Sequence, residues 1–532
     1  MRKESWTAVQ NDNLSLKEII SYIPDHLYDY YEKTGLEEIK DSILKCSSGD
    51  KGCRETVMEL IRMYLERIPE AERYNLLPCF NPDLLNPYFR FEILLYMKEK
   101  AEEGCGFLSL YDEYFSKNFF VEEVLEIGAE DINTIFKAEN YLPEIEDLNA
   151  ILSRIVFAQA LGLGVIDSLN YEKGVEEIQI GMSGKNFSGY DYKNVLSGRE
   201  TESGKCFEGV YLMCRGRLLK LNFLSFGSES EMKRVIRNLI ADCGCGELTP
   251  VNPMIVTESC DGRRITVSCP PATEGYSALI RKFDVGSLIC LEKLYPELRN
   301  AVEIRKLLGF IVKSGCHIAI TGDMASGKTT LFRALLEQVP AGNSIRIIES
   351  ESFELNARAY LQDRNILTMR VSKTTPVNEV LAFARKTTGR VFGIGEVNSP
   401  DVASLAVDLS KIAGQLIFSA HYQSTEEMVS DFVNAKLCVG GYSDERLALS
   451  DALGAVCFDI HLGITRGIRY PEYINEVVRE PGGYRVKEIY KFDDKVFFVE
   501  KPSDKTMLKA KKIMKSEEYR GFTDFLTAGA KG

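Results

Sequence analysis

Eight consecutive residues of the chain have the types and order of a phosphate-binding loop. Residues 322–329 read Gly-Asp-Met-Ala-Ser-Gly-Lys-Thr, which satisfies the pattern G-x-x-x-x-G-K-[ST]. Gly322 and Gly327 permit backbone conformations and a close approach that a Cβ atom would forbid. Lys328 can reach the β- and γ-phosphate oxygens of a nucleotide, and the Thr329 hydroxyl can ligate Mg²⁺. The predicted nucleotide-binding residues are Gly322, Ala325, Ser326, Gly327, Lys328, Thr329 and Thr330.

The segments on either side of this loop are those that the chemistry requires. Residues 316–320 form an apolar run that predicts a buried strand, and residues 330–336 carry apolar side chains at helical spacing. A strand, a glycine-rich turn and a helix N-terminus point backbone N–H groups and the positive end of the helix dipole at a phosphate. The sequence therefore predicts a site for a nucleoside triphosphate.

Hydrolysis needs further groups, because water must be oriented, a metal held and the developing charge opposed. Taken singly, a strand that ends in a polar residue is ordinary, since strand ends meet solvent. Taken together, three such endings downstream of the loop indicate one site along one edge of a parallel sheet. The apolar runs 345–348, 391–395 and 416–420 end in Glu349, Glu396 and His421, respectively.

Composition is that of an ordinary globular protein with more than one domain. The 532 residues are 45% apolar and 27% charged, and about two to four domains are expected for this length. The net charge of −13 argues against a general nucleic-acid surface, so no nucleic-acid partner is expected. No apolar stretch reaches the ~18 residues of a membrane span, and the polar start of the chain predicts no signal peptide. The 14 cysteines lack zinc-site spacing, which favours reduced thiols in a reducing cytoplasm.

The patterning of the chain predicts four regions. Residues 1–147 carry apolar side chains at helical intervals and are predicted to be all-helical. Residues 148–283 mix helical and strand-like patterns, which predicts a smaller α+β domain with an exposed insertion at 181–206. Residues 284–500 alternate strands and helices, as an α/β nucleotide-binding domain does. Residues 501–532 form a basic tail, whose lysines are either a solvated face or a contact with an anionic membrane surface.

Several short motifs follow one another along the chain. They are Asp261-Gly262-Arg263-Arg264-Ile265 with Pro270-Pro271, Ile280-Arg281-Lys282-Phe283, the phosphate loop, Ile348-Glu349-Ser350 with Glu354-Leu355, Ile394-Gly395-Glu396-Val397, and Ser419-Ala420-His421. Glu349 lies 21 residues after Lys328 (349 − 328), and His421 lies 25 after Glu396 (421 − 396). In this order and spacing the set resembles the type II/type IV secretion and pilus-assembly ATPases. It is most similar to their tight-adherence (Flp) pilus branch, over about residues 148–490.

The resemblance implies both an architecture and a setting. It implies an α/β fold in which a RecA-like P-loop ATPase core follows a smaller α+β domain that swings against it. It also implies a cytoplasmic ATPase, with ATP and Mg²⁺, that forms a homo-oligomeric ring, a hexamer. Such a ring would associate peripherally with the inner face of the cytoplasmic membrane, through the inner-membrane platform proteins of a pilus or secretion system.

The same resemblance implies roles for the site residues. Lys328 would hold the phosphates, and Thr329 and Glu396 would be the metal ligands. Glu349 and Glu396 would orient water, and His421 would sense the γ-phosphate. Arg264 and Arg281 of the smaller domain would supply positive charge as the domains close, which would couple transition-state stabilisation to domain motion.

This chain departs from the family's pattern at three places, and these departures leave more than one function possible. Ser350 stands where the family usually has Asp, Asn398 where it has Arg, and residues 410–412 where it has Thr-Gly-His. The leading interpretation is an ATP-driven motor that assembles pilins or exports substrates. The second is a nucleotide-gated scaffold of the same apparatus, which binds ATP without useful turnover. An unrelated phosphate-loop enzyme, such as a kinase or a DNA-processing ATPase, would need an acceptor pocket or a basic surface that the sequence does not offer.

Overall fold

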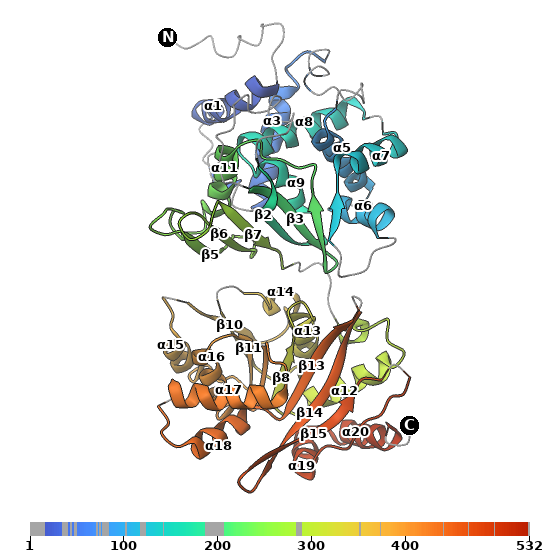
Figure 1. Cartoon of the computed structure of the whole chain (residues 1–532), viewed down its shortest axis with the longest axis vertical. Coiled ribbons are helices and arrows are strands. Elements are labelled where there is room, and N and C mark those ends of the chain that lie inside the picture. Colours follow the sequence, from blue (N-terminus) through green and yellow to red (C-terminus); the bar gives the residue numbers. More distant parts are fainter. Residues whose placement is uncertain are drawn as a thin grey trace. The chain divides into compact units, whose positions relative to one another are not determined.

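The chain folds into two compact units, Met1–Asp284 and Val285–Gly532 (Figure 1). The computed structural model describes residues 16–34, 41–42, 45–46, 50–70, 73, 76, 85–101, 104–116, 124–141, 143–186, 207–283, 290–350, 353–372, 374–439, 441–465, 468–493 and 495–529. Within these residues no helix has both the length and the apolar character to cross a membrane.

Helices make up most of the first part of the first unit. The central one is α8 (Ile145–Ala160), which buries a stripe of apolar side chains including Leu148, Ile155 and Val156 and contacts the N-terminal helices. The other helices are α1 (Leu16–Thr34), α3 (Lys51–Leu65), α5 (Pro87–Ala101), α6 (Gly106–Leu110), the π-helical turn η2 (Tyr111–Phe115), α7 (Ala129–Glu139), the 3₁₀ turn η3 (Gly164–Ile166), α9 (Asp167–Tyr171) and α11 (Glu229–Ile240).

A seven-stranded sheet completes the first unit, in the order β1-β4-β3-β2-β7-β6-β5. Burial alternates along its strands, so that Ile265 and Val267 of β6 are buried whereas Arg264, Thr266 and Ser268 are half-exposed. All strand pairs are antiparallel except β1 with β4. The strands are β1 (Leu125–Ile127), β2 (Val175–Asn186), β3 (Phe207–Cys214), β4 (Arg217–Leu221), β5 (Met254–Glu258), β6 (Arg264–Ser268) and β7 (Ser277–Arg281).

The predicted helical region and the predicted α+β domain share one hydrophobic core. A single cluster of buried side chains runs from Leu16 in α1 to Ile280 in β7. The predicted all-helical region also contains one short strand, β1, because its residues extend the sheet beside β4. Of the predicted insertion 181–206, the first six residues belong to β2, and residues 187–206 lie outside the described residues.

The second unit is a three-layer α/β structure around an eight-stranded sheet, in the order β10-β9-β11-β12-β8-β13-β14-β15. The strands from β10 to β13 are parallel, and β14 and β15 add an antiparallel hairpin at one edge. The strands are β8 (Ile318–Gly322), β9 (Ile345–Ser350), β10 (Ile366–Val371), β11 (Val391–Val397), β12 (Gln415–Ala420), β13 (Phe458–Thr465), β14 (Ile468–Glu480) and β15 (Gly483–Lys491).

Two buried clusters lie on the two faces of this sheet, which explains why β8 and β12 are buried along their whole length. One cluster packs α12 (Ala301–Lys313), α13 (Lys328–Gln338), α19 (Asp504–Ile513) and α20 (Ser516–Gly529) against the sheet. The other packs α15 (Val377–Ala384), α16 (Pro400–Ser410), α17 (Thr425–Cys438) and α18 (Glu445–Ala455). The short helices η4 (Leu291–Lys293) and α14 (Ala357–Tyr360) complete the unit. The predicted RecA-like P-loop core is therefore present, with β12 between the loop strand β8 and β11.

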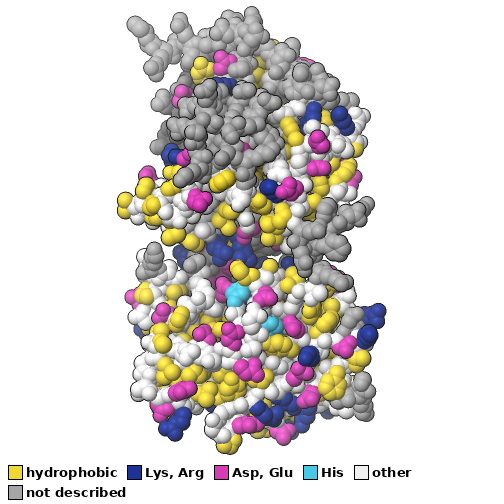
Figure 2. All heavy atoms as spheres, viewed as in Figure 1, with side chains coloured by type: hydrophobic (Ala, Val, Ile, Leu, Met, Phe, Trp, Pro, Cys, Tyr) yellow, Lys and Arg dark blue, Asp and Glu magenta, His cyan; other side chains and the backbone are white. Residues whose placement is uncertain are grey.

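The residues predicted as a basic tail fold onto the second unit as α19 and α20. The Phe310 ring of α12 stacks on Phe522 of α20, with 5.0 Å between the ring centroids, and Lys313 pairs with Glu518 at 3.1 Å. Lys505, Lys511, Lys512 and Lys515 remain exposed. On the face of the second unit drawn in Figure 2, acidic, basic and apolar side chains are interspersed rather than gathered by kind.

Candidate nucleotide-binding site

The phosphate-binding loop has the predicted strand–turn–helix structure. β8 ends at Gly322 and α13 begins at Lys328, with Gly327 as the residue before the helix. Gly322 has a φ of 130°, and a Cβ atom there would lie 2.3 Å from the carbonyl oxygen of Leu462 on β13. No side chain fits in that space, so this glycine is required by the close approach of the two strands.

Lys328 lies at the mouth of the loop with its ammonium group held by the loop itself. Its Nζ donates hydrogen bonds to the carbonyl oxygens of Gly322 at 2.9 Å and Asp323 at 2.6 Å. The side chain is buried, with 7% of its surface exposed. A fixed cation at a helix N-terminus adds its charge to the positive end of the helix dipole, and both favour an anion at this position.

His421 connects this lysine to Glu396. The Nδ1 atom of His421 lies 3.2 Å from Lys328 Nζ, and its Nε2 atom lies 2.8 Å from Glu396 Oε1. An ammonium group can only donate and a carboxylate can only accept, so Nδ1 accepts and Nε2–H donates. The three side chains thus form one contact series, Lys328–His421–Glu396, along the carboxyl ends of the parallel strands.

Glu349 lies beside this series, at the end of β9. It is buried, with 2% exposed, and its Oε2 atom accepts a hydrogen bond from the Leu355 N–H at 2.8 Å. A Cβ atom on Gly395 would lie 3.1 Å from the Cγ atom of Glu349, so Gly395 leaves the space that this carboxylate occupies. The sheet therefore brings Glu349 next to the residue that precedes Glu396.

The remaining loop residues carry hydroxyl groups, whose oxygen atoms can act as metal ligands or hydrogen-bond partners. The buried Ser326 hydroxyl has no hydrogen-bond partner among the described residues. Thr329 and Thr330 follow Lys328 in the first turn of α13 and are half-buried. Mg²⁺ prefers hydroxyl and carboxylate oxygens and completes its shell with water and substrate phosphates, so Thr329 and Glu396 fit the ion chemically. Among the described residues, no cluster of three or more His, Cys, Asp or Glu residues forms a protein-only metal site.

The two predicted arginines lie in the first unit. Arg264 on β6 is paired with Arg281 on β7, so both side chains lie on one face of that sheet, next to Glu177 on β2. The structure brings the two arginines together, on a face that is half-exposed. The contacts of the phosphate loop described above all lie within the second unit.

Residues on β13, β14 and α17 that no motif marked support the loop. Asp459, fully buried, accepts hydrogen bonds from the hydroxyls of Thr321 on β8 at 2.6 Å and Thr425 on α17 at 2.7 Å. His461 Nδ1 lies 2.9 Å from the Thr321 hydroxyl, and its ring stacks on Tyr473 with centroids 4.6 Å apart. Burial raises the pKa of Asp459 to about 6. The sequence signal was the appearance of Asp and His at alternate positions of an otherwise apolar strand.

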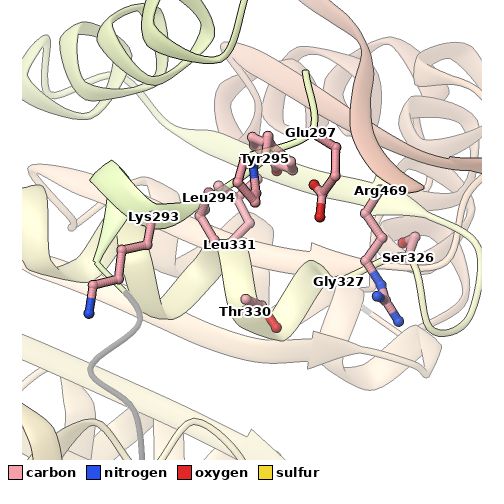
Figure 3. A pocket seen from close by; sticks show the side chains of 10 residues that line it. Lys293, Leu294, Tyr295, Glu297, Ser326, Gly327, Thr330, Leu331 and Arg469 are labelled. Atoms are coloured by element: carbon pink, nitrogen blue, oxygen red, sulfur yellow. The ribbon is translucent and has the colours of Figure 1, made fainter. Parts of the chain in front are cut away.

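A cavity of about 200 Å³ opens beside the loop, and Figure 3 shows the side chains that line it. Arg469 of β14 lies on one side, where its Nε atom donates a hydrogen bond to the carbonyl oxygen of Ala325 at 2.9 Å. The other lining residues are Lys293, Leu294, Tyr295, Pro296, Glu297, Ser326, Gly327, Thr330 and Leu331. Neither Arg469 nor the segment 293–297 stood out in the sequence, because neither carries a motif.

The positions that depart from the family pattern are all at the ends of elements. Ser350 is the last residue of β9, and Asn398 follows β11 and is exposed. Ser410 ends α16, and Lys411 pairs with Asp451 of α18 at 2.6 Å. Ser350 directly follows Glu349 at the end of β9, and Asn398 directly follows β11, which carries Glu396.

Comparison with known proteins found no matching family model and no matching curated protein. Among solved structures, the chain is similar to the VirB11 ATPase of the Brucella suis type IV secretion system, with 16% identity, a TM-score of 0.29, and coverage of 57% of this chain and 92% of that one. It is similar to the Legionella pneumophila ATPase DotB, with 14% identity, a TM-score of 0.36, and coverage of 68% and 93%. It is also similar to the pilus retraction motor PilT with bound ADP, with 12% identity, a TM-score of 0.36, and coverage of 66% of this chain and 85% of that one. These similarities concern the chain fold alone. What the chain does must follow from the side chains of its site.

Proposed function

We propose that this chain is an ATP-hydrolysing motor that powers pilus assembly or protein secretion across the inner membrane, of the tight-adherence kind that its motifs resemble. The observation that carries the proposal is the contact series Lys328–His421–Glu396 at the phosphate-binding loop. Phosphoryl transfer to water uses a cation for the phosphate oxygens and a carboxylate for water or metal, and the series holds one of each with His421 in contact with both.

In this proposal ATP binds with its phosphates at the N-terminus of α13. The ammonium group of Lys328, which the carbonyls of Gly322 and Asp323 hold, donates instead to the β- and γ-phosphate oxygens. The remaining loop residues, Ala325, Ser326, Gly327 and Thr330, contribute backbone N–H groups and hydroxyls. Thr329 and Glu396 hold Mg²⁺, which when bound neutralises charge on the β- and γ-phosphates.

Hydrolysis is assigned to the carboxyl ends of β9, β11 and β12. Glu349 and Glu396 orient the attacking water. His421 gives up its contact with Lys328 and, with a proton taken up on Nδ1, donates a hydrogen bond to the γ-phosphate while Nε2–H keeps its contact with Glu396. Arg264 and Arg281 of the first unit oppose the developing negative charge when the units close. An arginine that arrives only on closure makes hydrolysis depend on motion, which is what a motor requires.

The proposal extends to the setting in which the motor works. The active species is a homo-oligomeric ring, a hexamer, in the cytoplasm at the inner face of the cytoplasmic membrane. Its partners are the inner-membrane platform proteins of the pilus or secretion system, and no nucleic acid takes part. The exposed lysines of α19 carry no role in this proposal.

A second function is favoured by two particular residues. Ser350 and Asn398 stand where the resembling family has a carboxylate and a cation, next to Glu349 and Glu396 in the chain. Without those charges the chain could bind ATP and switch partner contacts with little or no turnover. The alternative is therefore a nucleotide-binding scaffold of the same apparatus.

Steady-state ATP hydrolysis by the purified chain separates the two, with Lys328→Ala as the test variant. We expect Lys328→Ala to lose hydrolysis while the chain still folds, because it removes the phosphate cation but no member of the hydrophobic clusters. The matched control is Lys386→Ala, at an exposed lysine of the same unit. Light scattering on the same samples reports whether the active species has the mass of a ring.

Each outcome of this experiment selects one interpretation. Turnover that Lys328→Ala removes and Lys386→Ala keeps, from a ring-sized species, supports the motor. ATP binding without turnover supports the scaffold. Undiminished hydrolysis in Lys328→Ala would show that the site has been placed wrongly.

A further inference from the structure

The cavity beside the phosphate loop has the position of a nucleoside pocket. Its floor is Gly327, Thr330 and Leu331, which are the end of the loop and the first turn of α13. The phosphates of a nucleotide lie at that helix N-terminus, so the next group of the molecule, its sugar, lies at the mouth of this cavity. The inference made here therefore rests on the proposed function.

Two walls of the cavity differ in chemistry. Leu294, Tyr295 and Leu331 line the apolar side of the cavity, where Leu294 is half-buried and Tyr295 and Leu331 are buried, with 8% and 1% of their surfaces exposed. Apolar and aromatic walls of this kind suit the flat face of a base. Glu297 and Arg469 add one carboxylate and one guanidinium from different elements, and Figure 3 shows the Glu297 carboxylate pointing into the cavity.

Arg469 is already fixed at the loop. Its Nε–H donates to the Ala325 carbonyl, and its Cδ atom would lie 3.2 Å from a Cβ atom on Gly327. The guanidinium thus lies against the part of the loop that carries the phosphates, and its terminal nitrogens remain as donors. On this side of the cavity, the guanidinium of Arg469 is placed to donate hydrogen bonds to a phosphate of a bound nucleotide.

Glu297 has the opposite chemistry, because a carboxylate accepts hydrogen bonds and repels phosphate. The groups of a nucleotide that can donate to it are the ribose hydroxyls and the exocyclic amine of the base. The ribose follows the phosphates directly, and a carboxylate that accepts from sugar hydroxyls is a known way to recognise a ribonucleotide. We infer that Glu297 is a specificity-determining residue that accepts hydrogen bonds from the ribose hydroxyls, so that the site selects ribonucleotides over 2′-deoxyribonucleotides.

The test compares ATP with dATP on the full chain, because the two molecules differ only in the 2′-hydroxyl. We expect the wild-type chain to bind ATP about tenfold more tightly than dATP, the effect of one hydrogen bond to a charged group. In Glu297→Gln the affinity for ATP should fall toward that for dATP, and the ratio should shrink to within about twofold. Glu297→Asp, which keeps the charge on a shorter side chain, should restore part of the ratio.

Two further variants separate this role from general effects on the pocket. Glu292→Gln changes an exposed carboxylate of the neighbouring η4 turn that does not line the cavity, and it should keep the wild-type ratio. Arg469→Ala should weaken ATP and dATP alike, because the phosphate end is the same in both. Isothermal titration gives both affinities without requiring turnover.

The outcomes distinguish this inference from the proposed function. Equal affinity of the wild-type chain for ATP and dATP would overturn the role of Glu297 and leave nucleotide binding intact. A wild-type preference that Glu297→Gln retains would overturn it as well. Binding of neither nucleotide would overturn both proposals.

Discussion

At the scale of residues, the proposed chemistry depends on the contact series Lys328–His421–Glu396. Each contact restricts the next, because the ammonium group fixes which nitrogen of His421 accepts and leaves the other N–H for Glu396. A γ-phosphate that draws Lys328 away would change the contacts of His421 and, through it, those of Glu396. Glu349 is restrained separately by the Leu355 N–H, so the two carboxylates can take different roles.

The first prediction at this scale concerns Glu396. Glu396→Gln keeps the size of the side chain and the contact with His421 but removes the negative charge that would orient water and metal. We expect ATP to bind and kcat to fall by about 100-fold or more, the usual effect of losing a general acid–base group. The variant should therefore retain ATP in a filter-binding assay.

Glu379→Gln is the matched control, since Glu379 is exposed on α15 of the same unit. It should hydrolyse ATP at the wild-type rate. If Glu396→Gln retained no nucleotide on the filter, or if it turned over normally, the assigned role of Glu396 would be wrong.

At the scale of elements, a buried carboxylate connects the loop strand to a helix on one face of the sheet. Asp459 on β13 accepts from Thr321 on β8 and from Thr425 at the start of α17, and Asn475 on β14 donates to Thr425 at 3.0 Å. α17 begins four residues after His421, so this network ties the strand that carries the phosphate loop to the segment that carries the histidine. Small movements of either element are thereby coupled.

The pH dependence of stability tests this network. Burial raises the pKa of Asp459 from 3.8 to about 6, so the folded state binds this proton more tightly than the unfolded state. The contribution of this proton to the free energy of unfolding is fully present below pH 3.8 and is lost as the pH rises through about 6. Asp459→Asn should remove this loss, which is on the order of 3 kcal/mol between those limits.

The measurement is urea unfolding of the second unit between pH 4 and 6.5, followed by hydrogen exchange of β8, β13 and α17. The wild type should lose stability with rising pH relative to Asp459→Asn. The control Asp401→Asn, at an exposed acid of α16, should follow the wild type. If the free energy of unfolding changed equally with pH in the wild type and in Asp459→Asn, the raised pKa of the Asp459 carboxyl would be contradicted.

At the scale of the whole molecule, the chain consists of two units that each contain their own cores. In the first unit, buried polar contacts join the N-terminal helices to the rest. Arg54 of α3 pairs with Asp167 of α9 at 2.7 Å, and both are buried. The Arg54 guanidinium also lies 4.3 Å from the Tyr171 ring centre, with Arg263 5.5 Å from the same ring. A buried pair of this kind is costly to break.

This arrangement predicts how fragments of the chain fold. Residues 285–532 should fold alone, because both clusters of the second unit lie within them. Residues 148–284 should not, because the core that covers their sheet includes Leu16, Ile61 and Phe91. Residues 1–284 are the matched control and should unfold cooperatively.

Thermal unfolding followed by circular dichroism gives the answer for all three fragments. A cooperative transition in 1–284 and 285–532, with none in 148–284, is the expected result. A cooperative transition in 148–284 would instead show that the helical region is a separate domain, as the sequence pattern alone suggested.

The sequence by itself determined the parts of this protein that are local. The loop from Gly322 to Thr329, its strand and its helix are consecutive residues, so composition and periodicity were enough to predict them. The positions of Glu349, Glu396 and His421 within one residue of the carboxyl ends of β9, β11 and β12 were also visible, because each follows an apolar run. Parallel strands share one carboxyl edge, which made their proximity predictable.

Only the tertiary structure decided which distant residues complete the site. The strand order places β12 between β8 and β11, and this order creates the contact of His421 with both Lys328 and Glu396. Arg469 of the β14–β15 hairpin contacts the loop at Ala325, Asp459 of the neighbouring strand β13 contacts Thr321 just before the loop, and Glu297 lines the cavity beside the loop. Periodicity reports only which face of an element is buried. The contacts of Arg469 and Asp459 depend instead on which elements become neighbours, and packing between residues more than a hundred positions apart decides that. Glu297 lies in a connecting segment that carries no sequence motif.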